Sequence, residues 1–134
     1  MTTDPLPFNC CYTDDHEWVL LGSATELPDH PVRVGITRLA ADSVGELVFL
    51  DLPEVGVEVQ IGEACGEVES TKTVSELFAP VSGRVTAVNQ AAVEDPALVS
   101  ADPYGKGWLF AVLATAAGGL LSATEYAQKN GFTS

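Results

Sequence analysis

The chain has 134 residues, enough for one domain, and its 46% hydrophobic content is sufficient for a core. Nineteen acidic residues against six basic ones give a formal net charge of −13, which argues against a nucleic-acid partner, because phosphate backbones are bound through Lys and Arg. The longest nearly apolar run, residues 108–121, is too short for a membrane span, and an odd cysteine count without a C-x-x-C pair predicts a reduced, cytoplasmic chain.

The N-terminal part of the chain predicts an arm followed by a strand. Residues 1–11 contain prolines and little hydrophobic periodicity, so we expect a loosely ordered arm there and a single domain over residues 12–134. Hydrophobic residues at 18–21 predict the first strand. His16 precedes this strand in an acidic cluster, but its spacing matches no zinc motif and His30 lies in a proline-flanked loop, so no metal site is predicted.

The next segment predicts a connection, a strand and a short helix. Residues 22–31 form a polar, proline-containing connection that is long for a hairpin, and residues 32–36 have the composition of a strand. Thr37 can cap a helix over residues 38–43, which Gly45 can end. The side chains of this helix that we expect to face inward are Leu39 and Val44.

Four further strands are predicted in the middle of the chain. Residues 46–51 form an apolar run that Pro53 stops, and residues 55–61 alternate valine or isoleucine with other residues, as in a half-buried strand. Residues 64–69 and 74–78 flank a polar tip and predict a β-hairpin.

The last third of the chain predicts two strands and a helix. Residues 84–88 and 108–112 have strand composition, and residues 90–106 between them form a loop rich in Pro, Asp and Ser. Residues 122–125 have capping-box spacing and residues 130–131 are a stop signal, so a C-terminal helix is expected. Short strands, two small helices and frequent Gly and Pro together predict a mainly β sandwich or partly closed barrel.

The polar tip of the predicted hairpin carries Lys72. Glu69 and Glu76 flank this lysine and favour its ammonium form, whereas a catalytic lysine needs a lowered pKa. We therefore expect Lys72 to be modified by another enzyme. Cys65 could be the nucleophile of a small hydrolase, but the neighbouring glutamates raise a thiol pKa, so a packed structural cysteine is favoured. An unmodified acidic β-sandwich binding module remains an alternative.

Glu69-Ser70-Thr71-Lys72 and the residues that follow resemble the lipoylation segment of the glycine cleavage system H-protein family. Other lipoyl and biotinyl domains share the lysine hairpin, but further blocks on both sides also resemble this family, and the similarity covers residues 12–128. These blocks are residues 12–18, 34–37, 45–49, 75–85 and 96–108.

The resemblance implies a barrel-sandwich hybrid, the lipoyl-domain fold, with short helices that include one at the C-terminus. It also implies a carrier rather than an enzyme, with lipoate in amide linkage to Lys72, while Glu69 and Ser70 belong to the attachment motif. In this family the lipoyl-lysine side chain is called the arm. When the arm carries an aminomethyl group, it lies in a cleft on the protein surface. Glu17 and Glu76 match the acidic positions of that cleft, where a carboxylate could hydrogen-bond a cationic amine.

The same resemblance implies a set of partners. A lipoate-attaching enzyme modifies the lysine, and pyridoxal-phosphate-dependent glycine decarboxylase then loads an aminomethyl group. The aminomethyltransferase passes the carbon to tetrahydrofolate, and dihydrolipoyl dehydrogenase reoxidises the arm. We expect these partners for this chain, and a monomer.

Related carriers remain as alternatives. A lipoyl domain of a 2-oxoacid dehydrogenase complex would usually be followed by a Pro/Ala-rich linker, and a biotin carrier would have methionine on both sides of its lysine. An H-like protein that relays lipoyl groups to other proteins is a further alternative. Three features depart from the family pattern. Leu39 stands where the family usually has a histidine or another ring, and Ser100 stands where it usually has asparagine. The connection at 22–31 is longer than usual.

Overall fold

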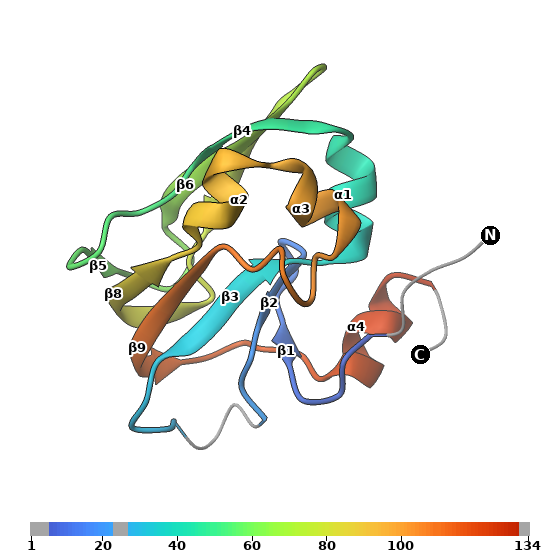
Figure 1. The fold of residues 1–134 in the computed structure, drawn as a ribbon. Helices are drawn as coiled ribbons and strands as arrows, with labels where there is room; N and C mark the ends of the chain where they lie inside the picture. The colour runs from blue at the N-terminus through green and yellow to red at the C-terminus, as the bar shows by residue number, and fades with distance from the viewer. Residues whose placement is uncertain (1–5, 23–26, 132–134) are drawn as a thin grey trace.

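Two antiparallel β-sheets face each other across the core of the computed structural model, which describes residues 6–22 and 27–131 (Figure 1). In sheet order, the larger sheet consists of β1 (Cys11–Tyr12), β2 (Glu17–Val19), β3 (Val32–Ile36), β9 (Phe110–Ala117), β8 (Val81–Val88) and β5 (Glu58–Val59). The smaller sheet consists of β4 (Leu47–Asp51), β6 (Ala64–Ser70) and β7 (Val74–Phe78). The predicted mainly β barrel-sandwich hybrid is confirmed.

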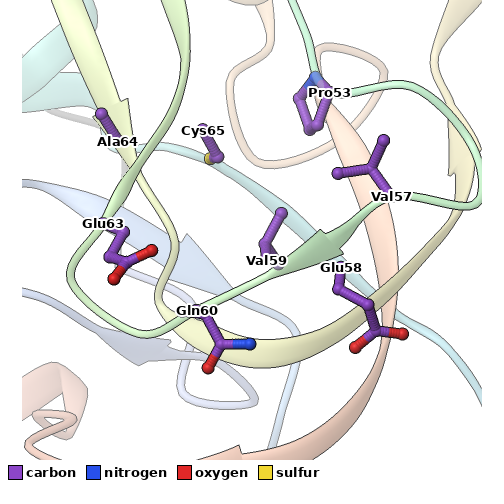
Figure 2. A pocket seen from close by; sticks show the side chains of 8 residues that line it. All are labelled: Pro53, Val57, Glu58, Val59, Gln60, Glu63, Ala64 and Cys65. Atoms are coloured by element: carbon purple, nitrogen blue, oxygen red, sulfur yellow. The ribbon is translucent and has the colours of Figure 1, made fainter.

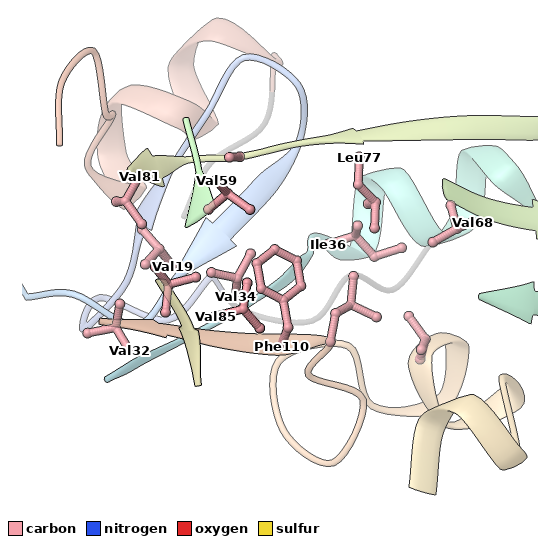
Figure 3. Packing of buried hydrophobic residues seen from close by; sticks show 14 of the residues in the cluster. Val19, Val32, Val34, Ile36, Val59, Val68, Leu77, Val81, Val85 and Phe110 are labelled. Carbon is pink, nitrogen blue, oxygen red and sulfur yellow. The ribbon is translucent and has the colours of Figure 1, made fainter. Parts of the chain in front are cut away.

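Inward-facing side chains of both sheets form one main core. Val34, Val85 and Phe110 come from the larger sheet, and Val68 and Leu77 come from the smaller one (Figure 3). Each of these five residues is at most 3% exposed. Because side chains alternate along a strand, the burial of one face of the smaller sheet leaves its other face in solvent.

Four short helices complete the described part of the chain: α1 (Arg38–Val44), α2 (Gln90–Glu94), α3 (Ala97–Ala101) and α4 (Ala123–Lys129). The predictions of α1 and α4 are confirmed, together with their caps. The hydroxyl of Thr37 accepts a hydrogen bond from the amide of Ala40 at 3.2 Å. Ser122 and Glu125 form the reciprocal capping box that their spacing indicates.

The inward face of α1 differs in part from the prediction. Val44 is buried, as predicted, but Leu39 is 38% exposed, so its predicted inward position is wrong. Ala41 and Val44 are three residues apart and share the buried face of the helix. Leu39 is two residues before Ala41 and therefore lies on the opposite side.

The strand predicted over residues 55–61 is wrong for most of its length. Glu58–Val59 pairs with β8 and Ile61 forms one isolated bridge with Ala79, but Val55 is 61% exposed. The chain turns at Gly56, which has a φ of 96° and donates a hydrogen bond to the carbonyl of Val85 at 2.8 Å. A left-handed glycine interrupts the strand conformation that regular alternation indicates.

The loop predicted over residues 90–106 contains α2 and α3. Each of these helices has five residues, which is too short to show a helical period in the sequence. Asp95 and Pro96 separate them, so the composition of the segment resembles that of a loop.

Part of the predicted N-terminal arm lies within the described residues. Leu6 and Cys10 are buried in a second hydrophobic cluster with Tyr12, Trp18 and Tyr126. Residues 1–5 of the arm and residues 23–26 of the long connection lie outside the described residues.

Among the described residues, no helix is long and apolar enough to cross a membrane. The three cysteines carry free thiols.

Replacement of Gly35 by alanine is expected to destabilise the fold. Gly35 pairs with Trp18 across β2 and β3, and a Cβ at position 35 would lie 2.5 Å from Cζ2 of the indole. The indole has no freedom to move away, because it is 2% exposed and its Nε1 donates to the carbonyl of Pro103 at 2.9 Å. We expect a loss of about 1–3 kcal/mol in the free energy of unfolding, measured by chemical denaturation.

Gly118→Ala is the matched control for this substitution, because no atom lies within 4 Å of a Cβ added at Gly118. Equal stability of the two variants would contradict the proposed clash.

Candidate functional site

The hydroxyl of Ser70 organises the turn that presents Lys72. Ser70 is 5% exposed. Its Oγ accepts hydrogen bonds from the backbone amides of Lys72 at 3.2 Å and Thr73 at 3.0 Å, and donates to the carbonyl of Thr73 at 3.3 Å. The amide of Ser70 donates to the same carbonyl at 2.8 Å. One small hydroxyl side chain therefore satisfies the polar backbone groups of a turn between two paired strands.

Lys72 is exposed at the tip of this turn. The amide of the preceding Thr71 donates to the carbonyl of Glu46 at 3.3 Å, which fastens the tip to the segment before β4. The lysine side chain passes Gly45, the residue that ends α1, so closely that a Cβ added there would lie 3.1 Å from Cε. Within the described residues its ammonium group takes part in no ion pair.

A row of carboxylates crosses the outer face of the smaller sheet. Asp51 lies opposite Glu67, and Glu67 lies opposite Glu76, so three exposed acids are adjacent on three neighbouring strands. Glu69 is exposed on the same face, beside the tip. Like charges directly opposite each other on a sheet are unfavourable. The row therefore adds a concentrated negative charge near Lys72 without contributing to the stability of the sheet.

Glu17 occupies a different environment from these surface acids. It is 2% exposed, and its Oε2 accepts a hydrogen bond from the amide of Phe78 at 2.6 Å. Its Oε1 is buried and has no hydrogen-bond partner among the described residues. Burial, with a smaller contribution from the nearby Asp15 carboxylate, raises the pKa of Glu17 to about 8, although the Phe78 amide acts in the opposite direction.

The two acids that the resemblance assigns to one cleft have unlike surroundings. Glu17 contacts Phe78, which is two residues from Glu76 along β7. Glu76 itself is exposed and pairs with Glu67. The three residues predicted to belong to an attachment motif, Glu69, Ser70 and Lys72, in contrast lie together at one hairpin tip.

Cys65 lies in a hollow on the flank of β6 (Figure 2). Burial, aided by the charge of Glu17, raises the pKa of the Cys65 thiol to about 12, so the thiolate is scarce at neutral pH. The residues that line the hollow include Glu58, Gln60 and Glu63 but no histidine that could act as a base. The arrangement favours a structural cysteine over the nucleophile of a hydrolase.

His16 takes part in a contact that the sequence did not indicate. Its Nδ1 lies 2.7 Å from the hydroxyl of Tyr126, and this hydroxyl lies 2.9 Å from Oγ1 of Thr37. The network joins the start of β2, the N-terminus of α1 and α4. Among the described residues no group of His, Cys, Asp and Glu side chains is arranged to hold a metal ion.

A family model described as "Glycine cleavage H-protein" matches residues 10–131. The chain is 52% identical over 126 residues to the glycine cleavage system H protein of Corynebacterium aurimucosum, which covers 94% of this chain and 96% of that protein. It is 50% identical over 122 residues to the glycine cleavage system H protein of Beutenbergia cavernae, with coverage of 91% and 94%.

A solved structure is similar over nearly the whole chain. The crystal structure of a glycine cleavage system H protein from Mycobacterium marinum has a TM-score of 0.92 and 57% sequence identity, and the match covers 95% of this chain and 100% of that one.

Substitution of Ser70 by alanine is expected to loosen the lysine turn. It removes the acceptor for the part-buried amides of Lys72 and Thr73, and the net contribution of a hydrogen bond of this kind is about 0.5–1.5 kcal/mol. The expected result is a lower free energy of unfolding and faster hydrogen exchange at these two amides, measured by NMR. Ser43→Ala, at an exposed position, is the control and should leave both amides unchanged. Unchanged exchange in the Ser70 variant would contradict this role of the hydroxyl.

Glu17→Gln is expected to alter how stability depends on pH. The folded-state pKa of about 8 lies above the ordinary value of 4.5, so folding favours the protonated carboxyl. The corresponding stability is complete below pH 4.5 and is lost as the pH rises through 8. The glutamine variant lacks this loss, so its stability relative to the wild type should increase across that interval, as measured by denaturation at a series of pH values.

Glu94→Gln, which changes an exposed acid, is the control for the pH series and should follow the wild-type curve. Parallel curves for the wild type and Glu17→Gln would show that Glu17 titrates with its ordinary pKa.

Proposed function

The chain belongs to the glycine cleavage H-protein family, and from this premise we propose that it carries lipoate in amide linkage to Lys72 and passes an aminomethyl group between enzymes. The family match over residues 10–131 favours this role over a lipoyl domain of a 2-oxoacid dehydrogenase complex or an unmodified binding module. We further propose that the protein functions in the cytoplasm, as a carrier without catalysis of its own.

The exposed, unpaired position of Lys72 on a rigid tip is the observation that carries the proposal. Its amine has no ion-pair partner within the described chain, so acylation would break no ion pair there. The turn beneath it is held by the Ser70 hydroxyl and by the Glu46 carbonyl. A modifying enzyme would therefore meet the lysine in one defined backbone geometry, which reduces the entropy lost on binding.

Each residue of the attachment motif has a separate role in this proposal. Ser70 positions the turn from a buried site, whereas Glu69 is exposed beside the tip and is available to a basic group of the lipoate-attaching enzyme. The neighbouring row of Asp51, Glu67 and Glu76 extends this negative surface. Such a surface suits association with positively charged partners, which is faster when charges are complementary.

We also propose that Glu17 holds the amine of the loaded arm. Lipoate would supply a disulfide that accepts the aminomethyl group, and the product has a cationic amine. The buried and unpartnered Oε1 of Glu17 supports this assignment, because a hydrogen-bond donor with positive charge would satisfy that oxygen and favour the ionised carboxylate. Glu76 could contribute from the outer face of β7, two residues from the contact of Glu17 with Phe78.

Three partner enzymes are proposed to act on the arm in turn. Glycine decarboxylase would load it, the aminomethyltransferase would remove the carbon, and dihydrolipoyl dehydrogenase would reoxidise it. Each partner would act on the same covalently attached group, so each must reach the tip at Lys72. A monomer leaves this tip accessible from several directions.

Lys72→Arg is expected to abolish modification. The arginine variant keeps the positive charge but has no primary amine to form the amide. Intact mass of protein produced in cells that attach lipoate should show a lipoyl adduct on the wild type and on the control Lys106→Arg, and none on Lys72→Arg. An adduct that persists in Lys72→Arg would refute the assignment. Glycine–bicarbonate exchange with glycine decarboxylase, present for the modified wild type and lost in the variant, would then test the proposed partner.

A further inference from the structure

We infer that an apolar pocket between α1 and α3 is the resting site of the uncharged acyl arm on Lys72, an inference that rests on the proposed lipoylation. The two helices lie side by side next to the lysine hairpin (Figure 1). The pocket between them has a volume of about 430 Å³, within the range of roughly 300–1,000 Å³ that is usual for small-ligand sites. It is lined by Ala41, Asp42, Gly45, Glu46, Ala97 and Ser100.

The lysine side chain already lies against one wall of this pocket. Gly45 is a lining residue, and a Cβ added to it would be 3.1 Å from Cε and 3.7 Å from Nζ of Lys72. An acyl chain attached to Nζ therefore begins beside the pocket. Gly45 has a φ of 95°, a conformation that residues with a side chain rarely adopt, so position 45 favours glycine and the approach stays open.

The two walls of the pocket are held together before any ligand is present. Arg38 of α1 donates from Nη1 to the carbonyl of Ser100 at 2.6 Å and from Nη2 to the carbonyl of Ala101 at 3.4 Å. The amide of Arg38 donates to the hydroxyl of Tyr104 at 2.9 Å. These bonds fix α1 relative to α3 and the turn that follows it, so the pocket is formed in advance and little ordering is needed on binding.

The chemistry of the lining suits an aliphatic chain with few polar atoms. Three of its six lining residues, Ala41, Gly45 and Ala97, are small and apolar. Ser100 adds a buried hydroxyl whose Oγ has no hydrogen-bond partner among the described residues.

The pocket is distinct from the position proposed for the aminomethyl-loaded arm. Glu17 contacts Phe78 at the end of β7 that is remote from the turn, whereas Gly45 lies beside the turn itself. A cationic amine gains a hydrogen bond and a charge partner at Glu17, and an uncharged arm gains only burial of apolar surface. Loading of the arm would therefore favour transfer from the apolar pocket to the buried carboxylate.

NMR of isotopically labelled protein, unmodified and lipoylated, tests this inference. We expect nuclear Overhauser contacts between protons of the arm and the methyl group of Ala97, and amide shift changes on lipoylation at Gly45 and Ser100. Ala97→Trp fills the pocket from an exposed position, and in this variant the lipoylation-dependent shift at Ser100 should be lost. Ala91→Trp, at an exposed position of α2 outside the pocket lining, is the matched control and should retain the shift.

Intact mass of each NMR sample separates the two proposals. A lipoyl adduct on Lys72 with shift changes confined to residues 70–73 would overturn the pocket assignment and leave the carrier function intact. Absence of the adduct in a host that attaches lipoate to other proteins would refute the carrier function itself. Retention of the Ser100 shift in Ala97→Trp would also overturn the pocket assignment.

Discussion

Burial of the inward face of the β6–β7 hairpin determines where Lys72 lies. Val68 and Leu77 anchor the hairpin in the core that both sheets share. A shift of one residue in the pairing of these strands would turn Val68 and Leu77 outward and bring the surface carboxylates inward, so the core specifies the register strongly. The position of the turn follows from this register. The tip is thus held by packing along the hairpin as well as by the local bonds of Ser70.

The protein uses carboxylates in two contrasting environments. Asp51, Glu67 and Glu76 are exposed, so water and salt screen their mutual repulsion. Their negative charge lies on the surface of the sheet that carries the lysine turn. Glu17 is removed from water and has one unsatisfied oxygen, an arrangement that disfavours its ionised form. A buried titratable group with a shifted pKa and an unpaired oxygen is a candidate functional group. The proposed contact with a cationic amine gives this carboxylate its missing partner.

In the proposed function, the protein would bind a lipoyl arm on Lys72 weakly enough to release it to each partner. The structure offers two dissimilar environments around one hairpin, an apolar pocket beside Gly45 and a buried carboxylate at Glu17. A change in the charge of the proposed arm would alter its relative affinity for the two environments, with no change in the fold required. Both environments are built on helices and strands that pack against one core.

The sequence by itself determined the features that depend on local chemistry. The caps of α1 and α4 follow from Thr37 and from Ser122 with Glu125, because these side chains bond to the backbone within a few residues. The hairpin around Lys72 follows from alternation interrupted by a polar tip, and the exposure of the lysine follows from its place at that tip.

Only the tertiary structure decided the features that depend on distant residues. Glu17 is separated from Phe78 by 61 positions, and its burial and hydrogen bond arise when β2 packs beside the end of β7. Val55 belongs to an alternating pattern but is exposed, because the turn at Gly56 takes the chain out of the sheet. The pocket beside Gly45 exists because Arg38 bonds to α3, 62 residues away. A pattern in the sequence records which side chains share a face of one element, whereas packing between elements decides which faces meet and what lies between them.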